Sequence, residues 1–173
     1  MGKGFRWYVM FGIVFLISST GINAMQKNID YVTNFDLNKY LGKWFEIARL
    51  PTSFEKDMIQ VTATYSLRKN GKVNVQNEGI KNGTHKTAIG TAKIAKDVNS
   101  GYFKVSFFWP FYADYKVIEL DPDYQYAMVA SSYDYLWILS RTPKLPDDVL
   151  KKLLEKAKAL GFDIGRLYFT PQN

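Results

Sequence analysis

One stretch decides the fold class of this 173-residue chain: Val61-Thr-Ala-Thr-Tyr-Ser-Leu-Arg-Lys-Asn-Gly-Lys-Val-Asn-Val-Gln-Asn77. Apolar and polar residues alternate strictly from Val61 to Arg68, which predicts a half-buried β-strand. Asn70-Gly71 is the preferred pair for a two-residue type I′ turn, and the alternation resumes at Val73. The stretch therefore predicts two antiparallel strands joined by a tight turn.

Further segments show the same strand pattern, and short turns such as Asn82-Gly83 separate most of them. Together with Val61–Arg68 and Val73–Asn77 they make eight predicted strands, the others being Trp44–Leu50, Ala88–Ala95, Tyr102–Trp109, Tyr112–Leu120, Tyr126–Ser131 and Tyr135–Ser140. No helical crossovers separate these strands, so a parallel sheet is excluded. Closing the strands into an up-and-down barrel removes both exposed edges, so we predict an all-β barrel. A β-sandwich is the alternative, but few long connections support it.

One α-helix is predicted after the last strand. Asp147-Asp148 follow Pro146 and place acidic groups at the positive end of the helix dipole, and Gly161 suits the C-terminal end. The apolar stripe of this helix consists of Leu150, Leu153, Leu154, Ala157 and Leu160. Because a barrel wall would cover this stripe, we expect the helix to pack on the outside of the barrel. Binding of the stripe to a membrane surface is the alternative.

Residues 1–24 have the features of a secretory signal peptide. Lys3 and Arg6 form a positive n-region, Trp7–Ile17 is an apolar run of eleven residues, and Ala24 suits cleavage after a small residue. A bilayer needs about 17–25 apolar residues, so this run is too short to span one. We expect residues 25–173 to form one exported domain, in the periplasm or secreted. Retention of the first residues as a membrane anchor is the alternative.

The composition excludes several kinds of site. The chain has no Cys, which excludes disulfide scaffolds, thiol enzymes, Cys-ligated zinc or iron–sulfur sites and lipid attachment through Cys. His85 is the single histidine, so sites that need two are excluded. A haem carrier with His85 as axial ligand is conceivable, but its place beside a turn favours an exposed loop residue. The net charge of +7 is spread along the chain without a basic motif, so nucleic-acid binding is not expected.

Three short motifs resemble those of the lipocalin family. Gly42-Lys-Trp44 opens the first predicted strand, Asp123-Tyr124 lies between the sixth and seventh, and Ser140-Arg141 ends the eighth. Pro122 stands where the family usually has Thr. The stretch from Gly42 to Pro51 is also similar to the bacterial outer-membrane lipocalins of the apolipoprotein D-like subgroup. The resemblance covers residues 34–170 and implies an eight-stranded antiparallel up-and-down lipocalin barrel with the C-terminal helix packed on the outside.

Structural roles for these motif residues follow from the resemblance and from side-chain chemistry. We expect Trp44 to plug the closed end of the barrel. Arg141, which arrives beside it from the last strand, is expected to stack on the indole and to donate to carbonyls of the N-terminal turn. Neither residue is expected to touch a ligand.

The interior of an eight-stranded barrel is either filled by side chains or holds one small ligand. If Trp44 faces inward, so does Ala48 on the same strand, and the family pattern places the small residues Ala63, Ala88, Gly90 and Ala92 inward on other strands. The larger residues Val61, Tyr135 and Leu139 are among those expected to face inward with them. Small residues favour an unfilled lumen, although a packed aromatic core is the alternative. We predict that the ligand wall consists of Tyr65, Val75, Asn77, Val105, Phe107, Tyr115, Val117 and Trp137. Glu46 and Glu119 are also predicted inward, where a carboxylate needs a partner, a proton or water.

The resemblance implies a lipid carrier that binds fatty acids or lysophospholipids for storage or transport in cell-envelope maintenance. No cofactor, metal site or catalytic residue is predicted, because the chain carries no Gly-x-Ser-x-Gly elbow, phosphate loop or His-bearing motif. Carriage of haem or a pigment, or an enzyme that acts on lipids, are the alternatives. Peripheral membrane association and a monomeric or homodimeric state are both compatible with the sequence.

Overall fold

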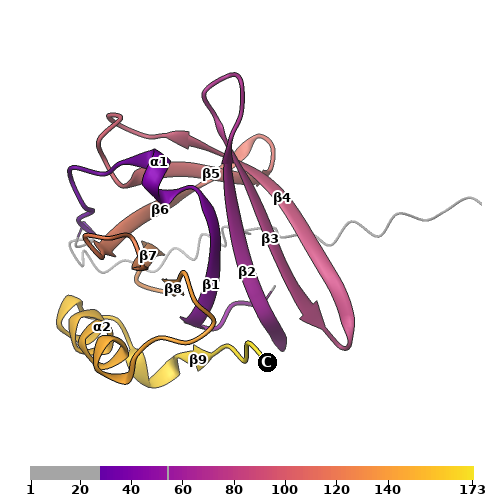
Figure 1. Cartoon of the computed structure of the whole chain (residues 1–173), viewed down its shortest axis with the longest axis vertical. Coiled ribbons are helices and arrows are strands. Elements are labelled where there is room, and N and C mark those ends of the chain that lie inside the picture. Colours follow the sequence, from indigo (N-terminus) through magenta and orange to yellow (C-terminus); the bar gives the residue numbers. More distant parts are fainter. Residues whose placement is uncertain (1–27, 54) are drawn as a thin grey trace, which may run out of the picture.

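The computed structural model of the chain describes residues 28–173 except residue 54, so the predicted signal peptide of residues 1–24 lies outside the described residues. Its strands are β1 (Gly42–Arg49), β2 (Met58–Leu67), β3 (Val73–Lys81), β4 (Thr84–Ile94), β5 (Tyr102–Phe108), β6 (Phe111–Leu120), β7 (Tyr126–Ser132), β8 (Tyr135–Ser140) and β9 (Tyr168–Phe169). Each of β2 to β7 pairs antiparallel with the next strand, β8 pairs with β1, and β1 pairs with β2 (Figure 1). This closure confirms the predicted eight-stranded up-and-down barrel.

The turn at Asn70-Gly71 differs from the prediction. Of the two residues only Gly71 has a positive φ, of 77°, whereas a type I′ turn needs positive φ at both central positions. Residues 68–72 instead form a longer loop, in which the Gly71 N–H donates to the Arg68 carbonyl at 2.9 Å. The φ pattern of a type I′ turn occurs between β3 and β4, at Asn82 (51°) and Gly83 (71°).

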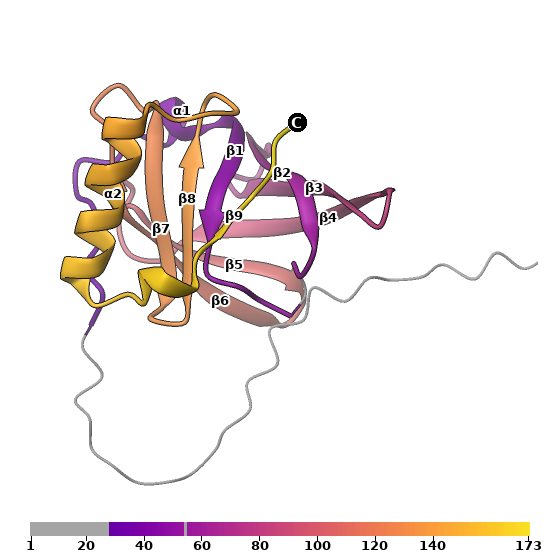
Figure 2. The same cartoon turned by 90° about the horizontal axis from the view of Figure 1, so that it is seen from below.

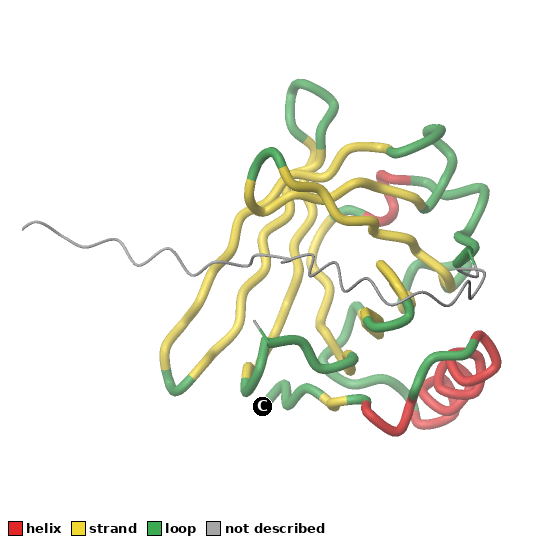
Figure 3. Tube along the Cα trace, turned by 180° about the vertical axis from the view of Figure 1, so that it is seen from behind, coloured by secondary structure: helices red, strands yellow, loops and turns green. Residues whose placement is uncertain are grey.

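The predicted C-terminal helix is confirmed as α2 (Asp147–Leu160), which lies on the outside of the barrel along β7 and β8 (Figures 2 and 3). Its residues Leu153 and Ala157 are buried in a core with strand residues such as Ile138. Gly161 ends the helix with a φ of 101°. The barrel wall therefore covers the centre of the apolar stripe. Within the described part of the chain, no helix is long and apolar enough to cross a membrane.

Register shifts in two strands change which side chains face inward. One lies between Glu46 and Ala48 in the β1–β8 pair, and the other between Val117 and Glu119 in the β6–β7 pair. An extra residue in a strand reverses the alternation of the residues that follow it. Ala48 accordingly packs in the core under α2, and Glu119 forms an ion pair with Lys156 of α2. The predicted inward orientations of Ala48 and Glu119 are wrong for this reason.

The closed end of the barrel is built as predicted. Trp44 is fully buried, and its Nε1–H donates to the carbonyl of Tyr40, the last residue of α1 (Leu37–Tyr40), at 2.8 Å. The Arg141 guanidinium lies 3.9 Å from the centroid of the Trp44 ring. It donates to the carbonyls of Lys39 (2.7 Å) and Lys43 (2.9 Å), so the last barrel strand is tied to the N-terminal turn.

The turn between β6 and β7 holds the remaining motif residues. The Tyr124 hydroxyl accepts a hydrogen bond from the Asp36 N–H at 2.8 Å, and the Tyr124 carbonyl accepts one from Arg141 Nε at 3.2 Å. Asp123 is exposed, and its backbone N–H donates to the side chain of Asp121 at 3.1 Å. These contacts give the motif a structural role at the closed end.

Candidate functional site: the barrel cavity

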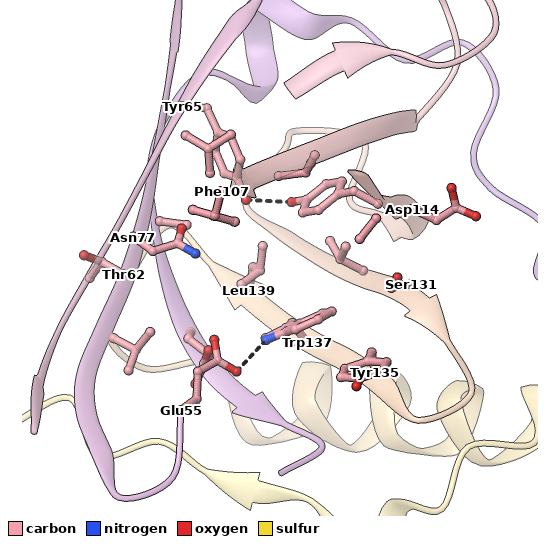
Figure 4. Close-up of a pocket in the computed structure, with 18 residues that line it drawn as sticks. Glu55, Thr62, Tyr65, Asn77, Phe107, Asp114, Ser131, Tyr135, Trp137 and Leu139 are labelled. Carbon is pink, nitrogen blue, oxygen red and sulfur yellow. Dashed lines mark hydrogen bonds between the residues drawn. The ribbon is translucent and has the colours of Figure 1, made fainter. Parts of the chain in front are cut away.

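A cavity of about 120 Å³ lies inside the barrel, and the empty space including its open mouth is about 920 Å³ (Figure 4). Its lining comes from every barrel strand except β4, and from the β1–β2 connection. The lining residues are Glu46, Glu55, Val61, Thr62, Ala63, Tyr65, Val75, Asn77, Val105, Phe107, Ala113, Asp114, Tyr115, Val129, Ser131, Tyr135, Trp137 and Leu139. A mainly apolar cavity with a few polar groups is the usual form of a small-molecule site.

Seven of the eight residues predicted for the ligand wall line this cavity, namely Tyr65, Val75, Asn77, Val105, Phe107, Tyr115 and Trp137. Val117 does not line it, and its predicted place in the wall is wrong. It follows Tyr115 on the same face of β6 but lies one step closer to the closed end, where it is fully buried in the core around Trp44. Contact of the other seven with a ligand stays a prediction.

The small residues of β4 do not leave the lumen empty. A Cβ atom added to Gly90 would lie 2.9 Å from Cδ1 of Phe107, so the Phe107 ring fills the space above this glycine. Ala92 is buried in the core of the closed end. Of the small residues predicted to face inward, Ala63 is the one that lines the cavity, and Ala113 of β6 is a second small lining residue.

Three tyrosines form the floor of the cavity toward the closed end. The Tyr115 hydroxyl is hydrogen-bonded to the hydroxyls of Tyr40 (2.7 Å) and Tyr65 (2.8 Å). Burial disfavours the phenolate, and it raises the pKa of Tyr65 to about 12 and the pKa values of Tyr40 and Tyr115 well above the ordinary value. The floor is therefore uncharged at neutral pH, and its hydroxyls already bond one another.

A buried ionic cluster lies at the opposite end, next to the mouth. Arg49 forms an ion pair with Glu46 and donates to Thr170 Oγ1 at 2.9 Å. The second carboxylate, that of Glu55, has its Oε2 atom 3.8 Å from Arg49 Nε. Arg49, Glu46 and Glu55 are only 2%, 3% and 5% exposed. The sequence left the partner of Glu46 open, and the structure shows that the partner is Arg49.

Glu46 and Glu55 both line the cavity, and Glu55 also contacts a predicted wall residue. Its Oε2 atom accepts hydrogen bonds from Thr52 Oγ1 (3.0 Å) and from Trp137 Nε1–H (3.4 Å, dashed in Figure 4). Burial, and then the nearby charge of Glu46, raise the pKa of Glu55 to about 7, whereas Arg49 opposes the shift. Glu55 can therefore gain or lose a proton near neutral pH.

Six lining residues were not predicted from the sequence: Glu55, Thr62, Ala113, Asp114, Val129 and Ser131. Ala113 could have been found, because it alternates with Tyr115 on the same strand. Thr62 follows a register shift in β2, and Glu55 lies in a connection without periodicity, so alternation finds neither. His85 is exposed on β4 and does not line the cavity, which gives the haem alternative no support.

Comparisons with known proteins agree with this geometry. Residues 35–172 match the family model of the lipocalin-like domain. The chain is 43% identical over 167 residues to the outer membrane lipoprotein Blc of Vibrio cholerae, covering 94% of this chain and 98% of the relative. It is 37% identical to temperature-induced lipocalin-1 of Arabidopsis thaliana (86% and 85% covered) and 36% identical to apolipoprotein D of Bos taurus (80% and 78% covered).

Solved structures show the same fold. Insecticyanin from the tobacco hornworm Manduca sexta superposes with a TM-score of 0.69 at 24% identity, over 83% of this chain and 84% of that chain. The cockroach allergen Per a 4 gives a TM-score of 0.66 at 22% identity, over 86% and 94%. At such identities the likeness shows the fold alone. The family match and the sequence relatives go further: the chain belongs to the lipocalin family, whose members bind small hydrophobic ligands.

Proposed function

We propose that the protein carries single-chain lipids, fatty acids or lysophospholipids, with the acyl chain inside the barrel. The observation that carries this proposal is the cavity itself: it is mainly apolar, it opens at one end, and its floor is a chain of three tyrosine hydroxyls that are hydrogen-bonded through Tyr115. A mainly apolar space suits a hydrocarbon tail. A headgroup would then lie near the mouth and water. We propose no catalytic residue.

The length of the ligand's acyl chain should set its affinity for the protein. Each buried CH₂ group contributes about 0.8 kcal/mol, which corresponds to roughly fourfold in affinity. Trp137, which lies on the wall beside Glu55, should contact the tail directly. Replacing Trp137 by Ala should remove apolar contact area and weaken binding by roughly tenfold or more.

A titration with single-chain amphiphiles of increasing length tests this proposal. The dissociation constant should fall roughly fourfold per added CH₂ until the cavity is full, and then level off. Leu67→Ala is a matched control, because Leu67 is an exposed apolar residue that does not line the cavity. An affinity that is independent of acyl-chain length would show that the cavity does not hold the tail. Equal losses of affinity in Trp137→Ala and Leu67→Ala would show the same.

We further propose that the protein is exported, to the periplasm or beyond, and works at the cell envelope. Support comes from the predicted signal peptide of residues 1–24 and from the relatives named outer membrane lipoproteins. The name of those relatives implies a lipid anchor, whereas the 173 residues of this chain include no Cys. We propose that contacts of the folded barrel contribute to association with the outer membrane.

The β5–β6 hairpin offers such contacts. Its side chains Phe108, Trp109 and Phe111 are 61%, 79% and 67% exposed. In an up-and-down barrel this hairpin lies at the same end as the β1–β2 connection that carries Glu55, which is the mouth of the cavity. Exposed aromatic side chains partition into the interface of a lipid bilayer. We propose that the hairpin touches the membrane while a lipid enters or leaves the barrel.

A further inference from the structure

The charged groups of the cavity are of one sign. Its described lining includes the acidic residues Glu46, Glu55 and Asp114 but no Lys or Arg. Asp114 is neutralised from outside by an ion pair with Lys104 and by a hydrogen bond from the Tyr102 hydroxyl at 2.9 Å. An anionic headgroup that entered this cavity would therefore find carboxyl groups in the described lining and no cation.

Arg49 cannot serve such a headgroup, because its guanidinium is committed elsewhere. Besides Glu46 and Thr170, it donates to the backbone carbonyls of Glu55 and Met58. Its Nε atom has no hydrogen-bond partner among the described residues and faces Glu55 across 3.8 Å. One cation thus stands between two buried carboxyl groups. With both ionised, the cluster would hold a net negative charge away from water, which is unfavourable.

We propose that Glu55 determines which headgroups the carrier accepts: uncharged or net-neutral single-chain lipids bind freely, and anionic ones bind only when Glu55 carries a proton. The inference rests on the proposed function and deepens it. An uncharged carboxyl group donates a hydrogen bond to an oxygen of the headgroup, whereas an ionised one repels an anion and cannot donate.

The surroundings of Glu55 support a proton at this position. The groups that face it are the charged pair Glu46 and Arg49 from β1, Thr52 from the β1–β2 connection and the indole of Trp137 from β8. Farther along the same lining, the titratable side chains are Asp114, Tyr65, Tyr115 and Tyr135. The pKa of Glu55 is raised to about 7, so the carboxyl group is mostly protonated below this pH and mostly ionised above it.

The expected pH dependence follows from linkage. If an anion binds only when Glu55 is protonated, the dissociation constant of the anion should rise roughly tenfold between pH 6 and pH 8. About one proton should then be taken up per anion bound at pH 8. A neutral ligand of the same chain length should show neither effect. Dodecanesulfonate and 1-monolauroylglycerol are suitable probes below their micellar concentrations, because neither titrates in this range.

Calorimetric titration of the unmodified protein with both probes, at pH 6 and 8 and in two buffers of different ionisation enthalpy, measures affinity and proton uptake together. For the sulfonate only, we expect the affinity to fall roughly tenfold from pH 6 to pH 8 and protons to be taken up on binding at pH 8. Glu55→Gln should abolish both effects, and Glu155→Gln, at an exposed position of α2, should retain them. Equal pH profiles for the two probes in the unmodified protein would overturn the inference, whether or not Glu55→Gln folds. If neither probe bound at any pH, the proposed carrier function itself would fail.

Discussion

Replacing Arg141 by Ala should destabilise the barrel without weakening ligand binding. The guanidinium stacks 3.9 Å from the Trp44 ring centroid and donates to three backbone carbonyls, those of Lys39, Lys43 and Tyr124. The stacking contact contributes about 0.5–2 kcal/mol. A hydrogen bond from a charged donor contributes about 1.5–3 kcal/mol when buried, but water can replace those to the exposed Lys39 and Lys43 carbonyls. We therefore expect a loss of about 2–4 kcal/mol in the free energy of unfolding.

Urea unfolding followed by tryptophan fluorescence measures this loss, since Trp44 is fully buried in the folded barrel. Arg141→Lys is the matched control: it keeps the charge but cannot donate to several carbonyls in one plane, so it should recover part of the stability. Affinity for a lauroyl ligand should change less than twofold in both variants, because Arg141 does not line the cavity. A loss below about 0.5 kcal/mol, or a large loss of affinity in a stable variant, would refute the structural role assigned to this residue.

Two further predictions concern the mouth of the barrel. The pKa of Glu55 is raised to about 7 in the folded protein, so the folded state binds more protons than the unfolded state between about pH 4.5 and 7. The contribution of Glu55 to stability should therefore decrease as the pH rises through this window. The free energy of unfolding at pH 5 minus that at pH 8 should therefore be about 2–3 kcal/mol lower in Glu55→Gln than in the unmodified protein. The same value in both proteins would count against the raised pKa. Trp109→Ser should lower severalfold the fraction of protein that floats with anionic lipid vesicles. The unfolding curve should not change, because Trp109 is 79% exposed. Unchanged flotation would argue against contact of the hairpin with the membrane.

The barrel could be predicted from the sequence because alternation and turn residues act locally. The run Val61–Arg68 needs no distant contact to indicate a half-buried strand, and strand β2 follows it closely. The closed end could also be predicted, because the family resemblance places Trp44 and Arg141 together and a guanidinium can stack on an indole. The two-residue strand β9 is too short to show a pattern and forms only where the chain returns to β1.

The orientation of individual side chains was harder to predict. Alternation holds only while the register is unbroken, and the shifts in β1 and β6 turned Ala48 and Glu119 to the outside. Val117 has the predicted orientation but lies beyond the floor residue Tyr115, and no local pattern shows where a cavity ends. Glu55 became part of the site through tertiary contacts with Arg49 and Trp137, which no spacing in the sequence indicates.

Mass spectrometry of the protein purified without detergent tests the central claim most directly. Native spectra should show the intact barrel with one bound molecule, and extraction should release a single-chain lipid, a fatty acid or a lysophospholipid. Protein in which Trp137 is replaced by Ala should retain less of that molecule. A uniformly ligand-free barrel after gentle purification, or a bound molecule without an acyl chain, would contradict the assignment of the cavity to lipid transport.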